Sequence, residues 1–137
     1  MAATRHRLGL QIGAFVVMPE HVHVLVRCPE GVSVSSVLGS LKRPVSANAK
    51  AWLAEHEPGW VEQLTVTRGG RRTFRFWQAG GGFDRNIWEQ KTLAEVVDYI
   101  HANPVRRGLV EKPADWEWSS ARFWVGMEGV LEMDRIG

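Results

Sequence analysis

The sequence contains little cysteine, lysine or tyrosine, and it has no long apolar run. Its one cysteine, Cys28, excludes an internal disulfide and any metal site built from several cysteines. No apolar run is long enough to cross a bilayer, and the first residues lack the long apolar segment and cleavage site of a secretory signal. These absences predict a cytoplasmic protein with no membrane partner.

Arginine supplies most of the positive charge, because the chain has only four lysines. The formal net charge is +2 and the predicted pI is near 9.0, which favours an anionic partner. The planar guanidinium group suits phosphate better than a lysine point charge does. Many basic proteins bind nothing anionic, so composition alone does not identify a nucleic-acid-binding protein.

A single domain over residues 1–137 is predicted, because no repeat, low-complexity segment or linker interrupts the chain. Residues 13–28 are typical of two β-segments separated at Pro19-Glu20, the second running from His21 to about Cys28. Residues 64–78 predict a β-hairpin that turns at Gly69-Gly70. Strands and helices that do not strictly alternate indicate an α+β sandwich.

Two helices are expected. The first follows a cap at Ser33 or Ser35, should kink or split at Pro44, and should bury apolar side chains on both sides of that proline. These side chains are Val37, Leu38, Leu41, Val45, Ala49, Trp52 and Leu53. The second covers residues 91–104, with Thr92 and Glu95 as a capping box. A further helical turn is expected to end at Gly108. Residues 112–124 form a tryptophan-rich tail that is expected to pack on the core.

His21 and His23 stand two apart in an apolar strand, so both side chains project from the same face. Two imidazoles in this arrangement can chelate one transition-metal ion. A His-x-His pair also occurs by chance on half-exposed strands, and two ligands leave a site incomplete.

Tyr99, the only tyrosine, falls on the flank of the apolar stripe of the second helix. Asn103 lies one turn further on and shares its face, so its amide oxygen could complete the coordination of a metal held by the histidines. Alternatively, Tyr99 is a boundary aromatic and Asn103 is only the residue before a helix-ending proline.

Four ordered motifs resemble the REP-associated tyrosine transposases, a branch of the single-tyrosine HUH transposases. They are VVMPEHVHVLV at residues 16–26, FWQ and GFDR between residues 76 and 85, DYIHANPVRRGLV at residues 98–110, and DWEWSSARFW at residues 115–124. The resemblance implies a ferredoxin-like antiparallel sheet with helices on one face. Members carry a strand and a long helix before the histidine strand, so the sheet here is expected to lack that strand and helix or to begin with a shortened segment.

The resemblance implies cleavage and rejoining of single-stranded DNA at hairpin-forming repeats through a 5′-phosphotyrosine, with Tyr99 as nucleophile. It further implies a Mg²⁺ or Mn²⁺ ion on His21, His23 and Asn103, and imidazole ligands make manganese the better chemical fit. The protein would be bacterial and nucleoid-associated, a monomer or a homodimer. Its partner would be single-stranded or hairpin DNA.

The residues expected to contact DNA are basic and lie in three groups. They are Lys42 and Arg43 in the first helix, Arg68, Arg71, Arg72 and Arg75 around the hairpin, and Arg106 and Arg107 after the second helix. Trp77 and Trp88 could stack on bases, although core packing is the favoured interpretation for both. Two other functions stay open: a non-catalytic DNA-binding remnant of a transposase, and a small metallohydrolase that uses the histidine pair.

Overall fold

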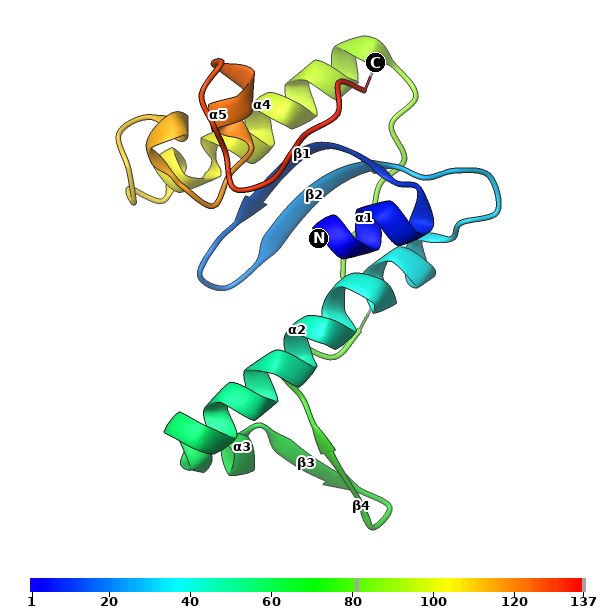
Figure 1. Ribbon diagram of the computed structural model, residues 1–137, viewed down its shortest axis with the longest axis vertical. Helices are drawn as coiled ribbons and strands as arrows, with labels where there is room; N and C mark the ends of the chain where they lie inside the picture. Colours follow the sequence, from blue (N-terminus) through cyan, green and yellow to red (C-terminus); the bar gives the residue numbers. More distant parts are fainter. Residues whose placement is uncertain (81, 137) are drawn as a thin grey trace. The chain divides into compact units, whose positions relative to one another are not determined.

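The computed structural model describes residues 1–80 and 82–136, and the chain divides into two compact units. Unit 1 comprises Met1–Val32 and Arg85–Gly137, and unit 2 comprises Ser33–Asp84. Among the described residues the strands pair as two antiparallel two-stranded sheets, one in each unit, and helices accompany both (Figure 1). The predicted α+β class is confirmed, whereas the prediction of a single domain stays a prediction.

Unit 1 begins with the short helix α1 (Ala2–Leu8), followed by strands β1 (Gln11–Val17) and β2 (Val22–Arg27). The two strands pair antiparallel from Gln11↔Arg27 to Val17↔Val22, and a β-bulge interrupts the register between Ile12 and Ala14. The predicted pair of β-segments separated at Pro19-Glu20 is therefore confirmed.

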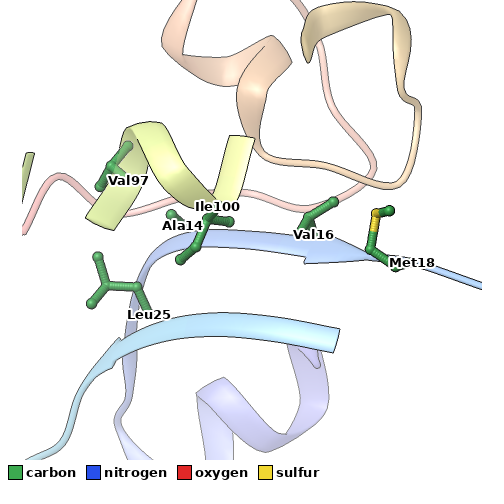
Figure 2. Close-up of a cluster of buried hydrophobic side chains, with 6 residues drawn as sticks. All are labelled: Ala14, Val16, Met18, Leu25, Val97 and Ile100. Atoms are coloured by element: carbon green, nitrogen blue, oxygen red, sulfur yellow. The ribbon is translucent and has the colours of Figure 1, made fainter. Parts of the chain in front are cut away.

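Helix α4 (Gln90–Arg106) packs along this hairpin and closes the core of unit 1 (Figure 1). Figure 2 shows this cluster of buried side chains, in which strand residues face α4: Ala14, Val16, Met18, Leu25, Val97 and Ile100. A second cluster joins Ile12 and Phe15 to Met133. Because the bulge shifts the alternation of β1, Ile12 and Phe15 lie in one cluster and Ala14 and Val16 in the other.

The C-terminal tail, with the 3₁₀ turn η1 (Pro113–Asp115) and helix α5 (Ala121–Trp124), packs back on the core as predicted, and Ser119 forms an isolated antiparallel bridge with Val16 of β1. The indole N–H of Trp116 donates to the carbonyl of Val17 at 2.9 Å, and that of Trp124 donates to the carbonyl of Gly13 at 3.2 Å. These bonds satisfy the two indole N–H groups, and the partly buried ring of Trp116 packs against the core of unit 1, whereas Trp124 is 41% exposed.

The predicted ends of the second helix need correction. Helix α4 begins at Gln90, with Glu89 as its N-cap, so Thr92 lies inside the helix and the predicted Thr92–Glu95 capping box is wrong. The helix also continues through Pro104 instead of ending there. Gly108 does close the following turn, since at φ 67° its N–H bonds to Val105 and the N–H of Leu109 to Pro104, a Schellman arrangement.

Unit 2 contains α2 (Val34–His56), α3 (Pro58–Gln63) and the hairpin of β3 (Thr65–Arg68) and β4 (Arg71–Phe74). Ser33 caps α2 as predicted, accepting a hydrogen bond from the N–H of Ser36. Pro44 does not split the helix. Gly69 and Gly70 have φ values of 53° and 74°, which builds the predicted two-residue turn.

The predicted burial along α2 is only partly right. Val37 is buried, but Val45 and Trp52 are exposed.

Within the described residues, no helix is long and apolar enough to span a membrane.

Candidate active site

Three aromatic side chains from two elements of unit 1 lie together. The rings of His21, immediately before β2, and His23, within β2, have centroids 4.8 Å apart. The centroid of His23 lies 5.8 Å from that of Tyr99 on α4. Because Val97 and Ile100 face the hairpin, Tyr99 stands at the edge of the contact and remains 48% exposed.

The surroundings of His23 disfavour the charged form of its imidazole. Burial of the ring, and to a lesser extent the neighbouring His21, lower the pKa of His23 below its usual 6.5. Burial penalises the charged ring, and a second nearby imidazolium would be repelled. Neutral imidazole is the form that binds metal ions.

Asn103, the expected third ligand, is buried one helical turn after Tyr99. Its side-chain amide donates to the carbonyl of Tyr99 at 2.8 Å, which leaves the amide oxygen as its acceptor. In the described part of the chain, no hydrogen bond or ring contact joins Asn103 to either histidine, and no group of three or more His, Cys, Asp and Glu side chains could hold a metal ion. The two imidazoles lie close together, and within the described residues a third protein donor to an ion that they shared would be of another residue type.

The two arginines at the end of α4 reach this site in different ways. The guanidinium carbon of Arg106 lies 5.0 Å from the centroid of the Tyr99 ring. Arg107 makes an ion pair with Glu20 at 2.5 Å, and Glu20 in turn lies 3.6 Å from Nδ1 of His21. Sequence reasoning gave Glu20 no role, although its position next to His21 was a usable signal.

His101, two residues after Tyr99, is turned away from the site. Its Nε2 lies 2.8 Å from the hydroxyl of Ser120, which accepts a hydrogen bond from the N–H of Phe15 at 2.8 Å. Burial lowers the pKa of His101, and Asp98 partly opposes this shift. His101 thus belongs to a buried network between α4, β1 and the tail.

The other expected DNA-binding residues lie in unit 2 and are described apart from the site. Arg68, Arg71 and Arg72 are exposed on the β3–β4 hairpin, and Arg72 pairs with Glu62 at 2.5 Å. Arg75 is half-buried just after β4. On α2, Arg43 bonds to the carbonyl of Gly39, and the ammonium of Lys42 lies 5.8 Å from the centroid of the Trp77 ring.

The two tryptophans that were expected in the core differ in burial. Trp77 is partly buried, and its indole donates to the carbonyl of Lys42 at 3.0 Å. Trp88 is 89% exposed, so its interpretation as a core residue is wrong. Its segment, residues 82–89, forms no helix or strand that would bury it.

Comparison with known proteins gives one family match over most of the chain. The family model described as IS200-like transposase matches residues 1–103. The chain is 30% identical over 112 residues to a provisionally named REP-associated tyrosine transposase of Haemophilus influenzae, and 30% identical over 113 residues to a REP-associated tyrosine transposase of Escherichia coli. These alignments cover 78% and 80% of this chain but 56% and 53% of the relatives, so the chain spans about half the length of the relatives it matches.

A solved structure has the same fold. It is a REP-associated tyrosine transposase bound to a REP hairpin, and the match has a TM-score of 0.61 at 24% sequence identity. The match covers 99% of this chain and 71% of the other. The family model and the two relatives confirm the resemblance found in the four sequence motifs, and this structure agrees with it in fold.

Proposed function

Because this chain belongs to the family of IS200-like transposases, we propose that it cleaves and rejoins single-stranded DNA at hairpin-forming repeats with Tyr99 as the nucleophile. The observation that carries this proposal is the approach of the Tyr99 ring to His23 and, through it, to His21. A half-exposed phenol beside two imidazoles can meet a phosphate from solvent. The order of the elements, a histidine strand and then a tyrosine helix, supports the same conclusion.

The proposed step is a transesterification. The oxygen of Tyr99 attacks the scissile phosphorus, the bond from phosphorus to the 3′ oxygen breaks, and a 5′-phosphotyrosine and a free 3′-hydroxyl result. The phenol loses its proton and the leaving 3′ oxygen gains one. Because one phosphodiester bond replaces another, the exchange is nearly isoenergetic and reversible. Attack by a 3′-hydroxyl on the phosphotyrosine rejoins DNA and releases Tyr99.

Several side chains would assist this exchange. Arg106 beside the ring of Tyr99 places a positive charge where phenolate and phosphate charges develop. His21 and His23, with Asn103 as the proposed added ligand, would hold a Mg²⁺ or Mn²⁺ ion. When bound, such an ion would polarise the phosphate oxygens. Asn103 also holds the carbonyl of Tyr99 and thereby steadies the helical turn that carries the nucleophile.

We also infer that the substrate is a DNA hairpin with unpaired flanks. The structural relative was solved with a REP hairpin, which supports this substrate class. The arginines of the β3–β4 hairpin would neutralise phosphates, and Arg106 and Arg107 would do so beside Tyr99.

The test is a covalent adduct assay. The protein is incubated with a labelled hairpin oligonucleotide and Mn²⁺, and the products are separated under denaturing conditions. We expect a protein–DNA adduct that Tyr99→Phe abolishes and His21→Ala strongly reduces, while both variants still bind the hairpin. Since Tyr99 is the only tyrosine, phosphotyrosine recovered from the adduct identifies the nucleophile without peptide mapping.

Two other outcomes would contradict the proposal. Hairpin binding without any adduct would make the chain a non-catalytic DNA-binding protein. Hydrolysis that survives Tyr99→Phe would indicate a metallohydrolase that works through the histidine pair.

A further inference from the structure

Unit 2 carries an excess of positive charge that unit 1 lacks. Between Ser33 and Asp84 there are seven lysines and arginines against four acidic residues, a formal net charge of +3. The remainder of the chain has ten against eleven, a net charge of −1. A polyanion would therefore be attracted to unit 2 more than to unit 1.

An open hollow of about 310 Å³ lies within this basic unit. It is lined by aromatic rings, hydrogen-bonding side chains and one cation, chiefly Phe74, Phe76, Trp77, Ser46, Gln78 and Arg75. Phe76 is 42% exposed, and its ring stands edge-on to Trp77 at a centroid distance of 5.4 Å. The hollow thus offers an exposed aromatic surface with a hydroxyl and an amide nearby.

The wall of this hollow is fixed from two sides. The N–H of Arg75 donates to the carbonyl of Leu64 at 2.7 Å, and the indole of Trp77 donates to the carbonyl of Lys42 at 3.0 Å. Phe76 lies between these two anchors. A ligand entering the hollow would therefore meet a surface that is already ordered, which lowers the entropic cost of binding.

Two further cations flank the rings. The ammonium of Lys42 lies 5.8 Å from the centroid of Trp77, and that of Lys50 lies 5.9 Å from the centroid of Phe74. An aromatic surface within reach of several positive charges suits a nucleotide, whose base stacks while its phosphates are neutralised. A paired base is stacked inside its duplex, so only an unpaired base can enter.

We propose that this hollow in unit 2 receives one unpaired base of the single-stranded flank of the DNA, stacked on Phe76, with Lys42, Lys50 and Arg75 on the adjacent phosphates. The inference rests on the proposed function for the identity of the nucleic acid, and it adds a place on the chain where the flank is recognised. Ser46 and Gln78 provide a hydroxyl and an amide for the edge of the base.

The test is a binding measurement in a chain that cannot form the adduct. In the Tyr99→Phe background, fluorescence anisotropy measures affinity for a hairpin oligonucleotide with unpaired flanks, in which an abasic site is moved one nucleotide at a time. We expect one flank position where loss of the base weakens binding about tenfold, the size of one stacking contact. Phe76→Leu should weaken binding of the intact probe by a similar factor. In the Phe76→Leu variant, removing the base at that flank position should cause no further loss of affinity.

Phe83→Leu is the matched control, because Phe83 is a 94% exposed phenylalanine of the same unit that does not line the hollow. Its variant should bind like the parent chain. Phe76→Tyr should retain affinity, and thermal unfolding should show that Phe76→Leu is folded.

Three results would overturn the inference. They are equal affinities for every abasic position, a loss from Phe76→Leu that adds to the loss from the abasic site at every position, and an equal loss of affinity in Phe83→Leu. Failure of the proposed function would appear in a different experiment. It would appear as the absence of an adduct in the parent chain, which does not affect the anisotropy measurement.

Discussion

Arg106 and Arg107 are neighbours in sequence, but their charges have different surroundings. Arg107 is paired with Glu20, whereas Arg106 makes no ion pair within residues 1–80 and 82–136 and lies over the ring of Tyr99. We predict that Arg106→Gln slows adduct formation by about a hundredfold, because it removes a positive charge from the place where negative charge develops. Single-turnover rates at saturating hairpin separate this effect from weaker DNA binding.

Arg107→Gln is the matched variant. It removes the same charge and leaves the Tyr99 ring contact intact, so its rate should fall much less, although its affinity falls in low salt. Equal losses of rate in the two variants would show that Arg106 acts only as a phosphate-binding residue.

The histidine pair leads to a prediction about metal removal. A chelator should abolish adduct formation, and added Mn²⁺ should restore it, while circular dichroism stays unchanged because the core of unit 1 is apolar. His23→Ala should weaken Mn²⁺ binding at least tenfold by titration calorimetry. His56→Ala, which removes an imidazole stacked on Trp52 in unit 2, should leave Mn²⁺ binding unchanged. Full adduct formation in the presence of the chelator would contradict this prediction.

At the scale of elements, the contact between α4, β1 and the tail depends on one buried hydroxyl. Ser120 accepts from the N–H of Phe15 and contacts Nε2 of His101, both in the interior. We predict that Ser120→Ala lowers the free energy of unfolding by about 1–3 kcal/mol, since these buried groups lose their partner. Urea denaturation measures this change.

Ser35→Ala provides the comparison, because Ser35 is exposed in the first turn of α2. Its effect should stay within about 0.5 kcal/mol. Should Ser120→Ala prove equally mild, a water molecule or a shifted side chain must replace the lost hydroxyl.

The elements differ in how well their sequences predict them. The cap was narrowed correctly to Ser33 or Ser35, of which Ser33 is the cap, and the turn at Gly69-Gly70 was predicted correctly, because each depends on the chemistry of adjacent residues. Pro104 was expected to end a helix and Pro44 to kink or split one, yet α4 continues through Pro104 and Pro44 does not split α2. A proline removes one helical hydrogen bond and favours a helix end, but contacts made elsewhere along a long helix can outweigh that cost.

The candidate site likewise has some features that depend on nearby residues in the sequence and others that depend on contacts between distant segments. The strand period placed His21 and His23 together, and the helix period placed Tyr99 at the border of the apolar stripe. The meeting of Tyr99 with the histidines was implied only by the resemblance to the transposase family, and the ring contacts agree with it. The ion pair of Glu20 with Arg107 could not, because these residues are far apart in sequence and meet only when α4 packs on the hairpin.

At the scale of the whole molecule, the division into two units was not visible in the sequence. Pro29 and Gly31 precede Val32, and a run of glycines precedes Asp84, but such short stretches also occur in ordinary loops and do not by themselves mark unit 2 as an insertion between two segments of unit 1. Exposed apolar side chains such as Val45 and Trp52 give the same pattern in sequence as buried ones. Contacts between distant segments decide both features.

The distribution of charge between the units predicts where DNA lies on the molecule. Lys42 and Lys50 belong to unit 2, and Lys91 and Lys112 belong to unit 1, so the four lysines report on both units in one experiment. We predict that a bound hairpin lowers the acetylation rate of Lys42 and Lys50 several-fold and leaves Lys112 nearly unchanged, because the net charge is +3 in unit 2 and −1 in unit 1. Mass spectrometry of the acetylated chain, with and without the hairpin, measures all four sites together. Uniform protection of the lysines, or protection of Lys112 alone, would mean that unit 2 does not provide the main DNA-binding surface.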